Sequence, residues 1–128
     1  MQDLKKGQFI DTYRGEIITH EEANRRSQSR TVDQEIYLME LDKWTEADGA
    51  AQYVCDGMHV SGPTRFINHC CEPNCAIYTV SYNHADINIY DLAFFATQAI
   101  PRGTGMYFTF CQPDHFRHDS ILIQKGQC

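Results

Sequence analysis

Short runs of β-branched and aromatic residues recur along the chain, and Gly, Pro, Asn and Asp stand between them. This pattern is typical of strands joined by turns. We predict strands over residues 8–13, 35–41, 75–82, 87–97 and 106–110.

Two turns are predicted where residues that favour a reversal of the chain occur together. Asp56 and Gly57 lie inside the run 52–60, and Asp-Gly supplies the positive φ of a tight turn, so this run is predicted to be a hairpin. Residues 101–103, Pro-Arg-Gly, form the second turn.

One helix is predicted over residues 20–30. Thr19 and Glu22 have the spacing of a capping box, in which the threonine side chain accepts from the N3 amide and the glutamate returns to the cap. Few positions in this segment are apolar, so the helix is expected at the surface. Its charges are expected to form a solvated face with modest ion pairs; they are Glu21, Glu22, Arg25 and Arg26. Many strands and one helix predict a mainly β domain of several small sheets.

Composition narrows the class of protein. The 128 residues are 42% hydrophobic and 22% charged, which excludes disorder and a collagen-like structure and indicates one domain. No apolar run approaches membrane-spanning length, and the first residues lack the apolar core of a signal peptide. The net charge of −6 argues against a sequence-independent contact with nucleic acid phosphates. It suits a basic partner such as a lysine-rich tail.

The chain has six cysteines, at positions 55, 70, 71, 75, 111 and 128. Because no signal peptide is evident, reduced thiols, some of them available to a metal, are favoured over a disulfide framework. Cys70, Cys71 and Cys75 do not form a regular zinc spacing by themselves.

The most informative segment is residues 65–75, RFINHCCEPNC. Residues 91–96 (DLAFFA) and 100–104 (IPRGT) follow it, and residues 7–19 and 37–42 carry further motifs upstream. In this order the motifs resemble the SET-domain protein lysine methyltransferases. The likeness is greatest to the heterochromatin branch that methylates lysine nine of histone three.

The resemblance implies a SET fold of small sheets with one short surface helix and a C-terminal pseudoknot, in which the last segment threads under another loop. The implied SET domain is 1–111, with 112–128 as a partial post-SET tail. The implied reaction transfers a methyl group from S-adenosylmethionine to a neutral lysine amine of a histone tail or another lysine-containing protein. Such a transfer needs alignment and a dry channel rather than a nucleophilic side chain. The implied location is chromatin in the nucleus, with no direct contact to nucleic acid or membrane.

The resemblance also assigns the residues of the site. The lysine channel is assigned to Tyr13, Phe108 and Phe110, and the cofactor contacts to Tyr37, Arg65, Asn68 and His69. Amide and imidazole side chains suit a cofactor site because each can donate and accept hydrogen bonds. Phenylalanine at position 108 tends, in the family, to permit higher degrees of methylation.

The sequence departs from the family in three places. The family opens with a Gly-x-Gly loop that cradles the cofactor, and this chain begins after it, so we expect an N-terminally truncated domain with an exposed sheet edge. Phe110 stands where the family has a tyrosine beside the target amine, a loss of about 2–4 kcal/mol if the hydroxyl acts in the transition state. Cys71 and Cys128 supply only half of a tetrahedral zinc site, so the post-SET zinc site is expected to be incomplete.

Three hypotheses stay open at this point. The chain is a SET-domain lysine methyltransferase by descent, with activity impaired by the departures above. Alternatively, it is a non-catalytic SET remnant that holds a histone tail or another chromatin protein. The third hypothesis is a fragment of a larger enzyme.

Overall fold

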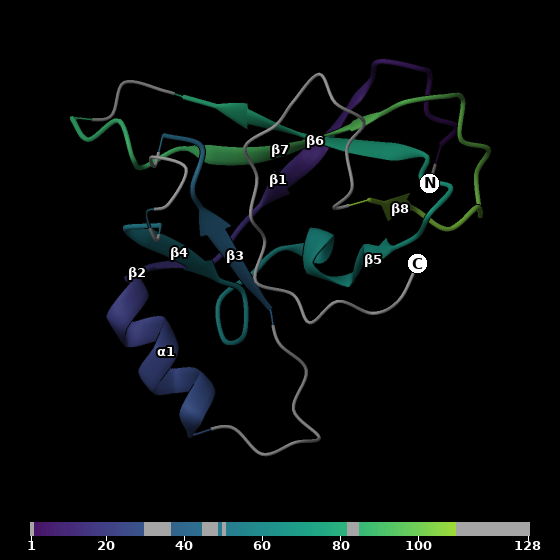
Figure 1. The fold of residues 1–128 in the computed structure, drawn as a ribbon. Coiled ribbons are helices and arrows are strands. Elements are labelled where there is room, and N and C mark those ends of the chain that lie inside the picture. Colours follow the sequence, from purple (N-terminus) through teal and green to yellow (C-terminus); the bar gives the residue numbers. More distant parts are fainter. Residues whose placement is uncertain (1, 30–36, 45–48, 50, 82–84, 110–128) are drawn as a thin grey trace.

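The computed structural model describes residues 2–29, 37–44, 49, 51–81 and 85–109 (Figure 1). In this part of the chain the strands form three small sheets, accompanied by one α-helix and a short 3-10 helix. The prediction of a mainly β domain with one short helix is therefore confirmed.

The first sheet has the order β1-β7-β6 and is antiparallel throughout. Its strands are β1 (Phe9–Tyr13), β7 (Asp91–Ala96) and β6 (Cys75–Val80). The Phe94 side chain on the central strand is fully buried and anchors the main hydrophobic cluster. β7 begins later than predicted because Asp86 forms a turn, accepting at its side chain from the amide of Asn88 at 2.9 Å.

The second sheet has the order β2-β4-β3, again antiparallel. Its strands are β2 (Glu16–Thr19), β4 (Tyr53–Asp56) and β3 (Leu38–Leu41). The predicted 52–60 hairpin is wrong, because β4 pairs on both sides with distant strands and ends at Asp56. The positive-φ glycines of the described residues are Gly7 and Gly103, so Gly57 does not form the expected turn.

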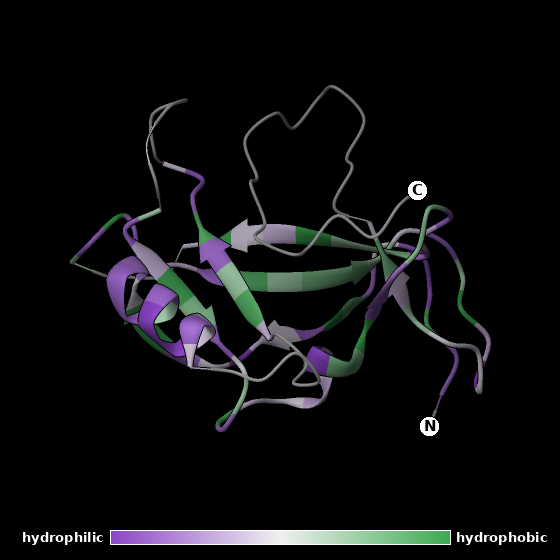
Figure 2. Ribbon diagram, turned by 60° about the horizontal axis from the view of Figure 1, so that its bottom comes forward, coloured by the Kyte–Doolittle hydropathy of each residue, from purple (hydrophilic) through white to green (hydrophobic). Residues whose placement is uncertain are grey.

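The helix α1 (His20–Gln28) packs against β2 and β4 through Ala23, its one buried residue. Thr19 caps it as predicted, its hydroxyl oxygen accepting from the amide of Glu22 at 3.2 Å. The Glu22 carboxylate does not complete the capping box as expected but accepts hydrogen bonds from Arg25 and Arg26. Figure 2 shows a mostly hydrophilic helix beside strands rich in hydrophobic residues, as its surface position requires.

The third sheet joins β5 (Asn68–His69) to β8 (Tyr107–Phe108) in parallel. The 3-10 helix η1 (Pro63–Phe66) leads into β5. Between β5 and β8 the chain makes the antiparallel β6–β7 pair and then the predicted turn, in which the amide of Thr104 donates to the carbonyl of Pro101 at 3.1 Å. No helix in the described part of the chain is long and apolar enough for a membrane span.

Candidate functional site

Tyr13 ends β1 with its side chain buried beside the start of β3. Its hydroxyl donates to the carbonyl oxygen of Tyr37 at 2.8 Å. The same carbonyl accepts from the amide of Gly57, also at 2.8 Å. Burial is the main cause that raises the pKa of Tyr13 well above its usual value, and the nearby Cys55 and Asp56 raise it further. Tyr13 therefore stays protonated at neutral pH, and its proton is directed at Tyr37.

Arg65, on η1, holds the loop that follows β4. Its Nη1 donates to the carbonyl oxygens of Gly57 and Met58, each at 2.9 Å. The guanidinium carbon lies 4.6 Å from the centre of the Tyr37 ring and 4.7 Å from that of Phe66, so the cation lies against two aromatic rings. This geometry makes Arg65 a support for Tyr37 and for the loop.

Asn68, His69 and Phe108 are brought together by the parallel β5–β8 pairing. Asn68 is in register with Tyr107, and His69 with Phe108. The amide of Cys70 continues the pairing by donating to the carbonyl of Phe108 at 2.8 Å. Asn68 is exposed and His69 is half-buried, whereas Phe108 is buried. The Phe108 ring packs edge-on against Phe94, with ring centres 5.6 Å apart.

Asn74 holds the β5–β8 pair, called the β5–β8 ribbon below, in place. The sequence alone did not single this residue out. It is buried, and its side-chain oxygen accepts from the amide of Tyr107 at 2.8 Å. Its side-chain nitrogen donates to the carbonyl of Gly105, and its backbone amide donates to Tyr107. The available signal was its place at the end of the Cys-Glu-Pro-Asn run of the motif. A buried Asn with both amide atoms bonded to backbone is a device for holding two segments in register.

Comparison with known proteins identifies the family of this domain. The SET domain family matches residues 1–111. The chain belongs to the SET domain family.

The chain is similar to curated proteins and to solved structures. The H3 lysine-9 specific histone-lysine N-methyltransferase dim-5 of Neurospora crassa is 46% identical over 116 residues, which cover 84% of this chain and 35% of the relative. The H3 lysine-9 specific histone-lysine N-methyltransferase of Schizosaccharomyces pombe is 44% identical over 121 residues, covering 94% of this chain and 24% of the relative. The solved structure of the Neurospora SET domain protein DIM-5 has a TM-score of 0.77 at 46% identity, covering 88% of this chain and 46% of that one. The chain thus spans about a third or less of these two curated relatives.

The described part of this SET domain holds no group of three or more Cys, His, Asp or Glu residues arranged to bind a metal. Cys71 is exposed and Cys70 is half-buried, while Cys55 and Cys75 are buried. Cys128, the other expected zinc ligand, and Phe110, the substituted channel residue, lie outside the described residues. The described residues therefore do not form a zinc site.

A charge cluster between α1 and the second sheet was also missed by the sequence. Arg26 donates to Glu16 at 2.8 Å, to Glu22 at 2.7 Å and to Asp56 at 3.1 Å. The expectation of a solvated charged face is wrong for Arg26, whose side chain is only 24% exposed and meets an Asp56 side chain that is 1% exposed. The reason is that Asp56 comes from β4, which no helical spacing could reveal.

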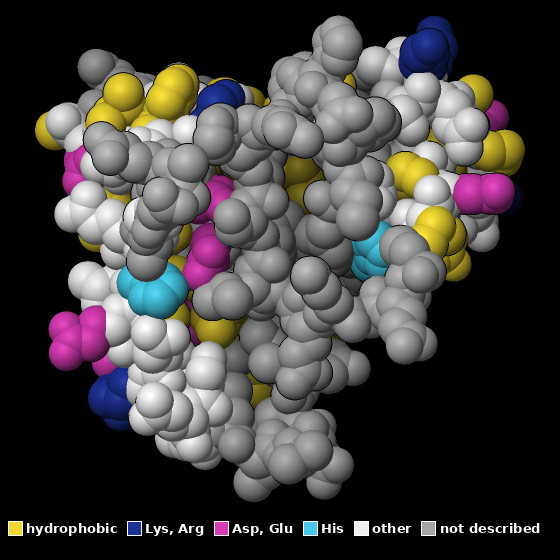
Figure 3. Space-filling model, in the orientation of Figure 1, with side chains coloured by type: hydrophobic (Ala, Val, Ile, Leu, Met, Phe, Trp, Pro, Cys, Tyr) yellow, Lys and Arg dark blue, Asp and Glu magenta, His cyan; other side chains and the backbone are white. Residues whose placement is uncertain are grey.

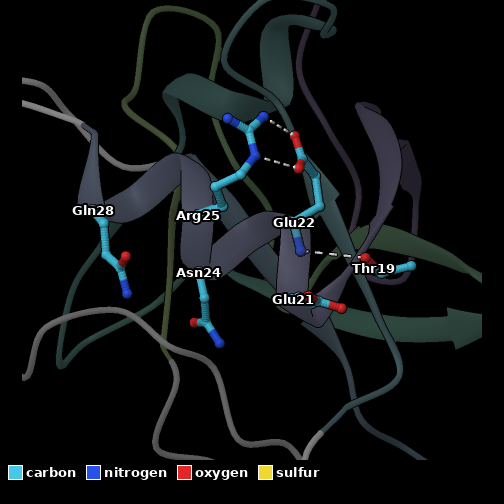
Figure 4. A pocket seen from close by; sticks show the side chains of 6 residues that line it. All are labelled: Thr19, Glu21, Glu22, Asn24, Arg25 and Gln28. Carbon is cyan, nitrogen blue, oxygen red and sulfur yellow. Dashed lines mark hydrogen bonds and ion pairs between the residues drawn. The ribbon is translucent and has the colours of Figure 1, made fainter.

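The outer face of α1 does fit the expectation. There Arg25 donates to both oxygens of the Glu22 carboxylate in an open pocket lined by polar residues of α1 and its cap (Figure 4). Hydrogen bonds from Arg25 and then Arg26 lower the pKa of Glu22 to about 2. On the face of the molecule shown in Figure 3, a few acidic side chains lie near one of the histidines.

Proposed function

We propose that this SET domain belongs to a protein lysine N-methyltransferase that uses S-adenosylmethionine and acts on a histone tail, at lysine nine of histone three. The observation that carries the proposal is the joint placement of Tyr13 beside Tyr37 and of Asn68, His69 and Phe108 on one ribbon. The names of the relatives, which are H3 lysine-9 specific, supply the substrate. An acidic chain suits a basic tail, and a histone substrate implies work at chromatin in the nucleus.

The donor set of the described residues suits the cofactor. The exposed amide of Asn68 and the half-buried imidazole of His69 can each donate and accept hydrogen bonds, as a nucleoside requires. We propose that these two residues and Tyr37 hold the cofactor, and that Arg65 contributes by supporting the Tyr37 ring. When bound, S-adenosylmethionine would supply an electrophilic methyl group on its sulfonium, and attack of a neutral amine on that carbon in line with the C–S bond would release the neutral thioether, S-adenosylhomocysteine.

The role of Tyr13 follows from its hydrogen bond. Because the Tyr13 proton is donated to the Tyr37 carbonyl, the lone pairs of the phenol oxygen stay available as acceptors. We propose that this oxygen accepts an N–H of the substrate amine and so aims the nitrogen lone pair at the methyl group. The buried Phe108 ring excludes water from its side of the lysine channel. We propose that the size of this ring influences how many methyl groups the channel accepts.

The replacement of tyrosine by Phe110 favours a second candidate, a non-catalytic module that binds a histone tail without methyl transfer. The two candidates differ in one measurable respect. A methyltransferase binds both cofactor and peptide, whereas a binding module needs only the peptide.

The first experiment is calorimetric titration of the purified chain with S-adenosylmethionine, followed by a methylation assay. The substrate is a histone H3 tail peptide, and the control peptide has arginine at position nine. Binding in the micromolar range and methylation of the first peptide alone are expected. Asn68→Ala should weaken cofactor binding about tenfold, the cost of one or two hydrogen bonds. Asn88→Ala, at the turn before β7, is the matched control.

Each other outcome has a defined meaning. Peptide binding by a folded chain that ignores the cofactor would support the non-catalytic module. Binding of neither ligand by a folded chain would refute both candidates. Equal weakening by Asn68→Ala and Asn88→Ala would refute the assignment of Asn68 to the cofactor site.

A further inference from the structure

Arg25 and Arg26 are neighbours on α1 with very different surroundings. The Arg25 side chain is 70% exposed and bonds Glu22 on the same helix. Arg26 turns inward and bonds carboxylates from three elements, namely Glu16 of β2, Glu22 of α1 and Asp56 at the end of β4. Guanidinium is suited to this task because its five N–H groups form a rigid planar fork.

The buried carboxylate of Asp56 fixes the backbone that follows it. Its Oδ2 accepts from Arg26 at 3.1 Å, and its Oδ1 accepts from the amide of Met58 at 3.0 Å. Gly57 is thereby held between the Asp56 carboxylate and the Met58 amide that bonds it. From the other side, Arg65 holds the Gly57 carbonyl at 2.9 Å.

Gly57 in turn lies directly against Tyr13. Its amide donates to the Tyr37 carbonyl that also accepts the Tyr13 hydroxyl. A Cβ atom added to Gly57 would stand 2.9 Å from the Tyr13 hydroxyl oxygen, closer than real Cβ contacts allow. The Gly57 backbone thus passes close to the Tyr13 hydroxyl and shares its acceptor, so a shift of Asp56 and Gly57 would disturb the Tyr37 carbonyl that Tyr13 bonds.

We propose that Arg26 is a positioning residue for Tyr13, acting through the Asp56 carboxylate and the Gly57 peptide. The inference rests on the proposed function for the catalytic meaning of Tyr13. It makes α1 a part of the apparatus that orients the lysine amine, rather than a surface helix alone. Arg25, one residue earlier and equally charged, meets Arg26 at the Glu22 carboxylate and donates to that carboxylate rather than to Asp56.

The first test does not depend on activity. Amide hydrogen exchange is measured at Gly57, with Phe94, buried in the first sheet, as the reference for global opening. Arg26→Gln should speed exchange at Gly57 about tenfold or more relative to Phe94, since it removes the Arg26 guanidinium from the buried Asp56 carboxylate. The matched control, Arg25→Gln, should leave both amides unchanged. Should Arg26→Gln fail to fold, Asp56→Asn, which keeps an acceptor for Met58 but loses the charge, is expected to give the same local effect.

The second test uses methylation of the H3 peptide. Arg26→Gln should lower kcat about ten- to a hundredfold, the effect of a displaced orienting group, and leave KM for S-adenosylmethionine within about twofold. Three outcomes would overturn the inference. They are unchanged exchange at Gly57 in Arg26→Gln, equal effects of Arg25→Gln and Arg26→Gln, and exchange at Gly57 that always changes together with exchange at Phe94. A parent chain that transfers no methyl group would instead refute the proposed function, and the exchange test would then decide the role of Arg26 alone.

Discussion

The side-chain nitrogen of Asn74 donates to the carbonyl oxygen of Gly105 at 2.8 Å, across 31 positions of sequence. The side-chain oxygen of Asn74 accepts from the amide of Tyr107, so one side chain binds a carbonyl and an amide of the segment that leads into β8. This pair of bonds holds Phe108 beside His69. The register of the candidate site therefore depends on a buried side chain that contacts neither ligand in the proposed scheme.

Asn74→Asp should destabilise the domain by about 2–3 kcal/mol. The carboxylate oxygen would face the Gly105 carbonyl without a proton to donate, and a buried charge would be left unpaired. Urea unfolding at pH 7 measures the effect. Asn24→Asp, on the exposed face of α1, is the control and should change stability by less than about 0.5 kcal/mol. Equal effects of the two substitutions would contradict the stabilising role of the Asn74 hydrogen bonds.

Gly15→Ala should also destabilise the domain, by about 1–3 kcal/mol. A Cβ atom at Gly15 would stand 2.6 Å from the carbonyl oxygen of Asp56 and 2.8 Å from the Cys55 sulfur, so backbone must move. The control is Gly62→Ala, where the nearest heavy atom is 3.7 Å away and belongs to the Arg14 side chain. Thermal unfolding of both variants checks the prediction, and a Gly15 variant as stable as the Gly62 variant would contradict it.

Glu40 should make stability fall as pH rises. Its side chain is 8% exposed, and burial raises the pKa of this carboxyl, while His20 at 3.2 Å opposes the shift. A carboxyl whose pKa is higher in the folded than in the unfolded chain favours folding when protonated. Its contribution is therefore present below the unfolded pKa and lost as pH rises through the folded pKa.

The difference in unfolding free energy between the parent and Glu40→Gln isolates this carboxyl. Measured by urea unfolding from pH 4 upward, the parent should lose stability relative to the variant until pH passes the folded pKa of Glu40. A parent that gains stability relative to Glu40→Gln over this window would show that the His20 contact outweighs burial.

Cysteine labelling should separate exposed from buried thiols. Burial, with added repulsion from Asp56 and Asp91, raises the pKa of Cys55 to about 12, so almost no thiolate exists at pH 8. Cys71 is exposed. Peptide-level mass spectrometry after brief iodoacetamide treatment should find Cys71 alkylated and Cys55 intact. Cys55 should react only in urea, and its labelling at the rate of Cys71 in buffer would be inconsistent with this core.

Phe110→Tyr should raise methyl transfer by the chain. The substitution supplies the hydroxyl that the family places beside the target amine, whose loss corresponds to about 2–4 kcal/mol of transition-state stabilisation, or roughly 30- to 900-fold in rate. The rate of H3 peptide methylation measures it, and unchanged cofactor affinity is the internal control. If neither chain methylates the peptide, the non-catalytic alternative gains support.

Local chemistry made much of the fold predictable. The Thr19 cap depends on a spacing of three residues, and the strands of the first sheet depend on runs of β-branched and aromatic residues. The 65–75 motif singled out Asn68 and His69 through its resemblance to the family, and their place in a cofactor site stays a prediction. Features that depend on residues close together in the sequence could be predicted.

The failures that matter most for the site involve partners that are distant in sequence. Asp56-Gly57 has the composition of a hairpin turn, but pairing of β4 with β2 and β3 overrides the local preference. The inward turn of Arg26 depends on Asp56, 30 positions away, and the bond of Tyr13 depends on a carbonyl 24 positions away. Such contacts are set by sheet packing, which a linear pattern does not encode.

The parallel β5–β8 pairing has a consequence for the order of folding. The β6–β7 pair joins strands that are near in sequence, whereas β5 and β8 meet only across that whole pair. Because β5 and β8 have two residues each and meet only around the β6–β7 pair, we expect the β5–β8 ribbon to form after that pair and to open before it. Asn68, His69 and Phe108 then belong to a less cooperative part of the domain than β6 and β7. Opening of the ribbon disassembles the candidate site while the β6–β7 pair stays intact.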